Sequence, residues 1–192
     1  EQARAEIERR MDAMVSRFPE WVETDVFGQT CAARPLRGIR IGNRNRCVAL
    51  VGAVHACESG PEIIIPVLER LLHEDRALLD HVGMAALPSL NCEARDRLRE
   101  KLPLGERPNP RGNLNGVDLN RNFPNDWARV ATNYGVRSDD PAAATYRGPA
   151  PASEAETQAT MAFVSRTRPA ALFSFHFFNS IVFCDECCNF FI

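Results

Sequence analysis

The sequence predicts an α/β fold in which helices flank a twisted, mixed β-sheet. Three short segments, 47–54, 84–90 and 170–175, are almost continuously apolar, which is typical of strands buried on both faces. Stretches with the apolar period of a helix alternate with them, and this alternation indicates the α/β class. A length of 192 residues suits one domain, so residues 1–192 are expected to form a single domain.

The N-terminal part is predicted to be a helix followed by two paired strands. Residues 3–17 are amphipathic with a helical period, and Phe18-Pro19 ends the helix. Val22–Phe27 and Leu36–Ile41 have the composition of strands. The polar segment 28–34 between them predicts a turn, so the two strands are expected to pair.

The central part is predicted to be strand, helix and strand. The first strand covers Cys47–Val54 and ends at His55. Pro61 suits the first turn of a helix, and residues 61–81 carry a helical apolar period. The next strand covers Met84–Leu90. His55 therefore lies at a strand exit, where open α/β sheets form ligand sites.

A long loop and a capped helix are expected next. Residues 101–151 are rich in Pro, Asn and Gly, which predicts a long functional loop. Ser153 is expected to cap a helix that runs to about Ser165. Glu156, three residues after Ser153, would complete a capping box.

Composition argues against nucleic-acid and membrane partners. The formal net charge is −2 and the basic residues are scattered, so no positive patch for nucleic acid or anionic membranes is expected. No apolar run approaches the ~18 residues that cross a bilayer. The seven cysteines are odd in number and irregularly spaced, which favours a reducing compartment such as the cytoplasm. Because the chain begins at Glu1, export with removal of a signal peptide stays open.

A zinc site is predicted from three side chains at strand exits. His55 and Glu58 form a His-x-x-Glu motif, and His176 directly follows the third apolar strand. Zinc binds imidazole nitrogen and carboxylate oxygen at roughly 2.0–2.2 Å, and two His with one Glu leave a fourth position for water, as in catalytic sites. The motif alone is common by chance, and a lone His at a strand end is more often a surface residue. The hypothesis therefore needs support from the rest of the chain.

Residues 111–124 supply this support. They read Arg-Gly-Asn-Leu-Asn-Gly-Val-Asp-Leu-Asn-Arg-Asn-Phe-Pro, and the part from Gly116 onward resembles the signature of the zinc metallocarboxypeptidase (funnelin, carboxypeptidase A-like) family. Further segments resemble the family in the same order: Phe18-Pro19, Phe27-Gly28, His55-Ala-Cys-Glu58, Tyr146-Arg-Gly148, Ser153-Glu154-Ala-Glu156-Thr157 and Ser174-Phe-His176. Together they span about residues 6 to 179.

The resemblance implies one Zn²⁺ ion and a peptide substrate with a free C-terminal carboxylate. It gives His55, Glu58 and His176 the role of metal ligands. It gives Asn120 and Arg121 the role of holding the substrate carboxylate. Arginine suits this role because its planar fork makes two charge-assisted hydrogen bonds to a carboxylate. A buried structural salt bridge is the alternative role for Arg121.

Two more residues of this loop have implied roles. Arg111 occupies the place of the family's oxyanion-stabilising Arg, and such a group contributes roughly 3–4 kcal/mol to lowering the barrier. Asp118 resembles the carboxylate that orients the first zinc His. The remaining polar residues of the loop are expected to serve the turn alone: Asn113, Asn115, Gly116 and Asn122.

The chain departs from the family pattern in several places. The family's general base is a Glu well downstream of the third ligand, whereas the only Glu after His176 is Glu186, which comes too soon. The carboxypeptidase-like catalytic domain is therefore expected to be incomplete at its C-terminal end. Cys57 replaces an Arg often found in the first zinc motif; it could bind zinc, but packing as a small residue is the favoured role. Segment 91–94 replaces the usual Asn-Pro-Asp-Gly turn. Three late cysteines have no assigned role: Cys184, Cys187 and Cys188.

Three functions fit this sequence. The first is zinc-dependent hydrolysis of a C-terminal peptide bond. The second is a related zinc deacylase that acts on N-acyl amino acids. The third is a non-catalytic module that binds zinc or peptide and lacks the general base. The spacing of Arg111 and the segment 153–157 favour the peptidase.

Overall fold

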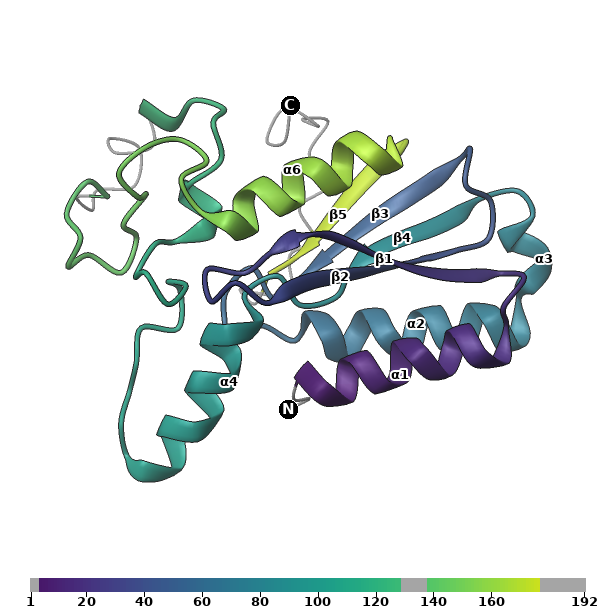
Figure 1. The fold of residues 1–192 in the computed structure, drawn as a ribbon, viewed down its shortest axis with the longest axis horizontal. Helices are drawn as coiled ribbons and strands as arrows, with labels where there is room; N and C mark the ends of the chain where they lie inside the picture. The colour runs from purple at the N-terminus through teal and green to yellow at the C-terminus, as the bar shows by residue number, and fades with distance from the viewer. Residues whose placement is uncertain (1–3, 129–137, 177–192) are drawn as a thin grey trace.

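A five-stranded mixed sheet forms the centre of the computed structural model, which describes residues 4–128 and 138–176 (Figure 1). Its strands are β1 (Val22–Gln29), β2 (Pro35–Ile41), β3 (Cys47–Gly52), β4 (Gly83–Leu87) and β5 (Ala171–Phe175). They lie in the order β1-β2-β4-β3-β5. β2 is antiparallel to β1 and β4, whereas β3 is parallel to β4 and β5. The predicted mixed α/β sheet is confirmed.

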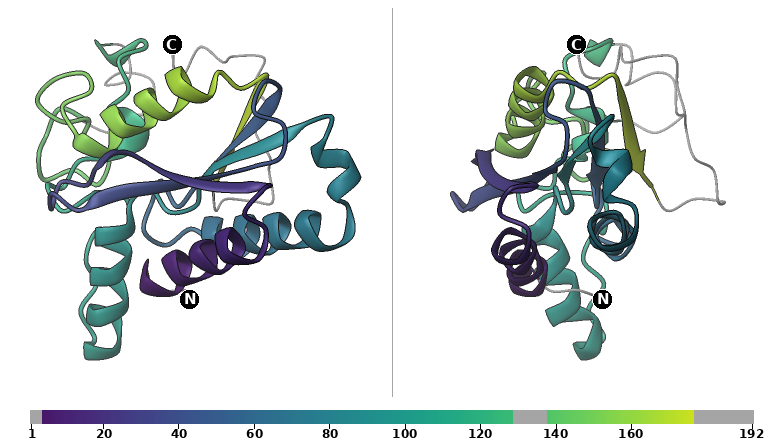
Figure 2. Two further views of the ribbon diagram at one scale, coloured as in Figure 1. Left: turned by 45° about the vertical axis from the view of Figure 1, so that its right-hand side comes forward. Right: turned by 90° about the vertical axis from the view of Figure 1, so that its right-hand side faces the viewer.

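Helices cover both faces of this sheet (Figure 2). Helices α1 (Arg4–Arg17) and α2 (Gly60–Glu74) pack on one face, and α6 (Ala155–Thr167) packs on the other. On the α6 face, the rings of Phe27 and Phe163 meet edge to face with centroids 5.0 Å apart. The opposite core joins apolar side chains of α1, α2 and the sheet, among them Met11, Ile39, Ile64 and Leu68. Burial of these two apolar layers fixes the sheet between the helices.

Three predicted boundaries are wrong in detail. β3 ends at Gly52 and not at Val54, because Ala53 adopts a left-handed conformation with φ of 49°. β4 ends at Leu87, just before Pro88, which has no N–H for the ladder. The single helix predicted for 61–81 is divided into α2 and the short α3 (Arg76–Leu79), because Asp75 leaves the helical conformation.

The sequence did not predict helix α4 (Cys92–Lys101), which projects from the body of the molecule (Figure 1). Most of its residues are charged, so it has only a narrow apolar side, with Ala94 and Leu98 buried. A short 3₁₀ turn, η1 (Leu102–Leu104), follows it, and a second, η2 (Leu119–Arg121), lies within the long loop.

The predicted cap of α6 is wrong. The helix begins at Ala155 with Glu154 at the N-cap position, and Ser153 lies outside it. The Ser153 hydroxyl instead donates a hydrogen bond to Glu154 Oε1 at 2.8 Å. The carboxylate of Glu156 accepts from the backbone N–H of Cys31 at 2.8 Å, so no capping box forms. β5, predicted to be buried, is half-buried along its length.

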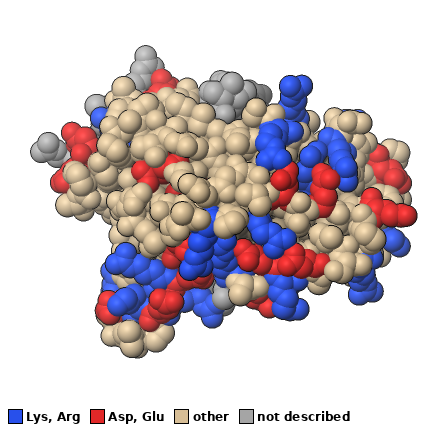
Figure 3. All heavy atoms as spheres, in the orientation of Figure 1, with Lys and Arg blue, Asp and Glu red and all other residues tan. Residues whose placement is uncertain are grey.

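Charged side chains of both signs lie next to one another on the face shown in Figure 3. Arg10 pairs with Glu69 across α1 and α2, and Arg37 pairs with Asp12. This face therefore carries no large patch of one sign. Within residues 4–128 and 138–176, none of the helices combines the length and the apolarity needed to cross a bilayer.

Replacing Gly60 by Ala is expected to destabilise the protein. Gly60 opens α2, and a methyl group there would overlap the backbone of Gly52 and Ala53 at the end of β3. We expect a loss of about 1–3 kcal/mol in the free energy of unfolding, as for other overpacked sites. Alanine normally stabilises a helix relative to glycine. A decrease in the free energy of unfolding, measured with urea, would therefore indicate steric overlap, whereas an increase would indicate helix propensity alone.

Ser59→Ala is the matched control. Ser59 is exposed and makes no side-chain cap bond, so its replacement is expected to change stability by less than about 0.5 kcal/mol. A Gly60→Ala protein as stable as the wild type would contradict the close contact between α2 and β3.

Candidate metal centre

Parallel pairing of β3 and β5 places the predicted ligands at one edge of the sheet. Gly52 at the end of β3 is the register partner of Phe175 at the end of β5. His55 follows Gly52 by three residues, and His176 follows Phe175 directly. Parallel strands leave the sheet at the same edge, so both imidazoles reach the same place although the chain between them is long.

The loop after β3 is held from both sides. The carbonyl oxygens of Gly52 and Ala53 accept hydrogen bonds from the N–H groups of Leu90 and Asn91, both at 2.9 Å. The N–H of Ala56 donates to the carbonyl oxygen of Pro110 at 2.8 Å. These bonds tie the loop to the segment after β4 and to the start of the long loop.

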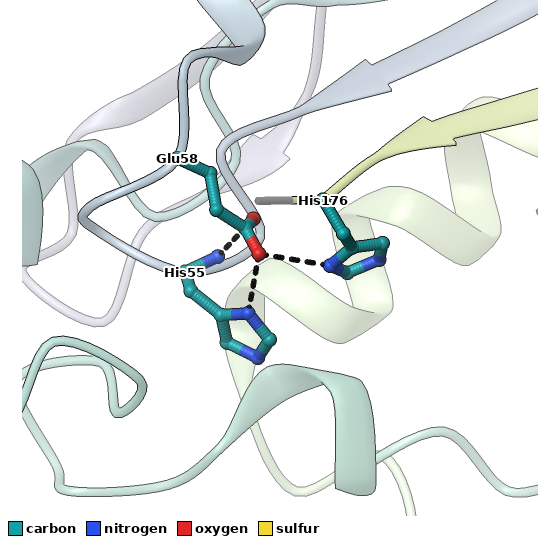
Figure 4. Close-up of side chains that lie close together, drawn as sticks. All are labelled: His55, Glu58 and His176. Atoms are coloured by element: carbon teal, nitrogen blue, oxygen red, sulfur yellow. Dashed lines mark hydrogen bonds and ion pairs between the residues drawn. The ribbon is translucent and has the colours of Figure 1, made fainter. Parts of the chain in front are cut away.

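Glu58 lies between the two imidazoles (Figure 4). Its Oε1 atom is 2.6 Å from Nδ1 of His55 and 2.9 Å from Nδ1 of His176. Its Oε2 atom accepts the backbone N–H of His55 at 2.9 Å. His55 and Glu58 are buried, whereas His176 is half-buried. His176 is therefore the most exposed of the three predicted ligands.

The donor atoms of these residues fit a zinc ion. One ligand atom from each of His55, Glu58 and His176 lies within 4.8 Å of the other two. Ligands about 2.1 Å from zinc in tetrahedral geometry are about 3.4 Å apart. The two contacts of Glu58 Oε1, at 2.6 and 2.9 Å, would lengthen by less than ~1 Å to reach this spacing. Cys57 is exposed and is not among this group of potential ligands. The nitrogen and oxygen donors are those that zinc prefers in catalytic sites.

The protonation equilibria at the centre are coupled to these contacts. Burial on its own would raise the pKa of Glu58, but hydrogen bonds from His176 and His55 outweigh it and lower the pKa to about 2. Burial would likewise lower the pKa of His55, but hydrogen bonds to Asp118 and Glu58 raise it. The carboxylate therefore stays ionised, as a metal ligand requires.

Asp118 contacts the far side of the His55 ring. Its Oδ1 atom lies 3.0 Å from Nε2 of His55 and accepts the N–H of Asn120 at 3.0 Å. Its side chain is fully buried. When Nε2 carries the proton and donates it to Asp118, the lone pair of Nδ1 faces Glu58 and the space for the metal. The orienting role that the resemblance implies for Asp118 stays a prediction.

Arg111 is held by the same carboxylate. Its Nε and Nη2 atoms donate to Asp118 Oδ2 at 3.0 and 2.8 Å. Burial would raise the pKa of Asp118, but the hydrogen bond from His55 and the charges of His55, Arg111 and Arg121 lower it. A single ionised carboxylate thus links the metal cluster to the arginines of the long loop.

Asn120 and Arg121 lie together on η2, directly after Asp118. Both side chains are half-buried, and Nη1 of Arg121 donates to the carbonyl oxygen of Asn120 at 3.1 Å. The structure therefore brings the two residues next to Asp118, within the same short turn.

Two asparagines of the loop are structural, as expected. Asn113 accepts the N–H groups of Asn115 and Val117 with Oδ1, and its Nδ2 donates to Glu154 at 2.7 Å. Asn122 donates through Nδ2 to the carbonyl oxygens of Arg147 and Ala150 and to the Ser153 hydroxyl. They attach the loop, on each side of Asp118, to the start of α6.

The sequence did not identify Arg95, a buried arginine on α4 that contacts the loop after β3. Helix α4 itself was not predicted, so nothing in the pattern placed Arg95 near the motif. The residues left without an assigned role, Cys184, Glu186, Cys187 and Cys188, lie outside the described residues.

The chain is similar in sequence to several zinc-carboxypeptidase relatives. The chain is 28% identical over 173 residues to mast cell carboxypeptidase A of Rattus norvegicus, covering 80% of this chain and 39% of the relative. It is 44% identical over 69 residues to murein peptide amidase A of Escherichia coli (strain K12), covering 34% of this chain and 28% of the relative.

A solved structure has the same fold. Carboxypeptidase A from Helicoverpa armigera matches with a TM-score of 0.77 and 18% identity, covering 93% of this chain and 46% of that chain. The chain thus spans less than half the length of each of these relatives. The family described as zinc carboxypeptidase, whose metal is zinc, matches residues 7–185. Because this match covers nearly the whole sequence, the chain belongs to the zinc carboxypeptidase family.

Proposed function

We propose that this chain carries the zinc site of an enzyme that hydrolyses C-terminal peptide bonds. The observation that carries the proposal is the convergence of His55, Glu58 and His176, whose ligand atoms lie within 4.8 Å of one another. These three side chains would hold one zinc ion. Bound zinc polarises the scissile carbonyl and lowers the pKa of its water.

The substrate carboxylate would be held by Asn120 and Arg121. Support comes from their place on η2, next to Asp118 and therefore close to His55. A guanidinium offers two parallel N–H donors to a carboxylate, which fixes both the position and the direction of the chain end. Such a contact would select the last peptide bond, because only there does a free carboxylate lie one residue from the scissile carbonyl.

Arg111 would stabilise the oxyanion that develops on the scissile carbonyl. Two of its donors are directed at Asp118, and a guanidinium has five N–H donors in all. Asp118 would thus orient His55 through Oδ1 and Arg111 through Oδ2. The proton-accepting Glu that the resemblance implies would lie downstream of His176, outside the described residues.

A second candidate is an amidase or deacylase that uses the same centre. The 44% identity to murein peptide amidase A over 69 residues favours including it. The metal chemistry would be the same, and the substrates would differ in the group attached to the scissile amide. A panel of blocked dipeptides, N-acetyl amino acids and murein peptides, assayed on the full-length protein, distinguishes these candidates. No turnover of any of them by a protein that binds zinc would favour a non-catalytic module.

Loss of zinc is expected to abolish hydrolysis. We expect His176→Gln to lower zinc affinity and the turnover of a blocked dipeptide by at least about 100-fold, because even partners outside the coordination sphere are worth 10–100-fold. Chelation of the wild type should give the same loss of turnover. Added zinc should restore turnover in the wild type but not in His176→Gln. Turnover of the dipeptide and zinc content by metal analysis are the measurements.

His81→Gln is the control for this change. His81 is an exposed histidine distant from the cluster in sequence, so both zinc content and activity should stay at wild-type values. Full activity after complete removal of zinc would refute the proposed chemistry.

Arg121→Met is expected to remove the preference for a free carboxylate. A hydrogen bond to a charged group contributes about 1.5–3 kcal/mol, so kcat/KM for the free acid should fall by about 10- to 100-fold. The corresponding dipeptide amide should be affected little. The ratio of the two kcat/KM values is the measurement.

Arg70→Met serves as the control for Arg121→Met. Its side chain is 72% exposed on α2, and its replacement should leave the ratio unchanged. If Arg121→Met keeps the wild-type ratio, Arg121 is a structural residue and the carboxylate is held elsewhere.

A further inference from the structure

Arg95 of α4 reaches under the loop that carries His55 and Glu58. Its side chain is 2% exposed. Nη1 donates to the carbonyl oxygen of Ala56 at 3.1 Å and to the carbonyl oxygen of Glu58. Nη2 donates to Oε1 of Glu62, in the first turn of α2, at 2.7 Å. One guanidinium thus contacts both carbonyls that flank Cys57 and the start of the next helix.

A buried cation is tolerated only where its charge and its donors are compensated. Here two backbone carbonyls and one carboxylate face the guanidinium from the loop after β3 and from α2. The same carbonyls belong to the His-x-x-Glu segment. The contacts of Arg95 therefore restrict the backbone conformation of this segment, which supplies the predicted ligands His55 and Glu58.

The N–H groups of His55 and Ala56 are held by Oε2 of Glu58 and by the carbonyl oxygen of Pro110, whereas Arg95 holds carbonyl groups of the same segment. Within it, the N–H of Glu58 donates to the carbonyl oxygen of His55 at 3.2 Å, which is long for a hydrogen bond. The carbonyl of Glu58 lies next to the Cα atom from which its carboxylate side chain projects. A bond to this carbonyl restricts the backbone from which the side chain projects, and the contacts with His55 and His176 then orient the carboxylate.

We propose that Arg95 is a positioning residue for the metal centre, which holds the His55–Glu58 loop so that both ligands face His176. The inference rests on the proposed zinc site. It extends that site to α4, a helix that contributes none of the proposed metal ligands. The planar fork is essential, because the three acceptors are spread over two elements, and the compact ammonium group of lysine cannot reach all three in one geometry.

The test is zinc affinity in the full-length protein, measured by competition with a chelator after the fold has been checked by circular dichroism. We expect Arg95→Met to weaken zinc binding by about 10- to 100-fold, in the range found for other residues that orient ligands. Arg95→Lys should be intermediate. In the Co²⁺-substituted proteins, the visible absorption bands of Arg95→Met should shift, because the coordination geometry changes. A residue that serves stability alone would not move these bands.

Two further variants make the result decisive. Arg97→Met, at an exposed position on the same helix, should keep wild-type affinity and spectrum. Glu62→Gln keeps Arg95 and removes the charge opposite Nη2, so it should weaken zinc binding by a few-fold. If Arg95→Met does not fold, Arg95→Lys and Glu62→Gln decide the question by the same readouts.

Wild-type affinity and an unchanged Co²⁺ spectrum in the folded Arg95 and Glu62 variants would overturn the inference. That result leaves the proposed function intact, provided that the wild type binds one zinc ion and His176→Gln loses it. If the wild type binds no zinc, the proposed function fails first.

Discussion

The parallel pairing of β3 and β5 is the constraint on which the metal centre depends. It brings together Glu58 and His176, which are 118 residues apart in sequence, at one edge of the sheet. The register sets the Phe175 end of β5 level with the Gly52 end of β3. A slip by one residue would turn the side chains of β5 to the opposite face and move His176 away from Glu58. The sheet core therefore determines the geometry of the ligands.

A chain of hydrogen bonds and ion pairs links the buried charged groups of the predicted metal cluster to the long loop. Arg111 binds one oxygen of Asp118, His55 binds the other, and the ring of His55 reaches Glu58 on its far side. Each carboxylate in this series is buried and therefore requires its partners. Because Asp118 is shared, its side chain couples the orientation of the first imidazole to the position of Arg111. The groups proposed to bind metal and substrate are thus parts of one electrostatic unit.

Much of this arrangement was predictable from the sequence, because it depends on strand exits. His55 and His176 each follow an apolar strand, and the carboxyl ends of parallel strands share an edge, so their proximity follows from the fold class. Arg95 was not predictable, because α4 is mostly charged and carries only a narrow apolar side. The cap of α6 failed for another reason. Ser153 matches a capping signature, but its hydroxyl instead accepts a tertiary hydrogen bond from Asn122 and donates a local one to Glu154.

The asparagines that flank Asp118 show how a loop without regular structure can present a charged group accurately. Asn113 bonds to Glu154, and Asn122 bonds to Ser153, so both ends of the segment are fixed to the start of α6. Helix α6 packs on the sheet through Phe163, which is fully buried. Through α6, the turn that carries Asn120 and Arg121 is therefore held in a fixed position relative to the sheet that places His55 and His176. A site ordered in advance loses less conformational entropy when it binds a ligand. If Asn120 and Arg121 hold a substrate carboxylate as proposed, Asn113 and Asn122 would contribute to its recognition without touching it, because they fix the position of the turn relative to the proposed metal ligands.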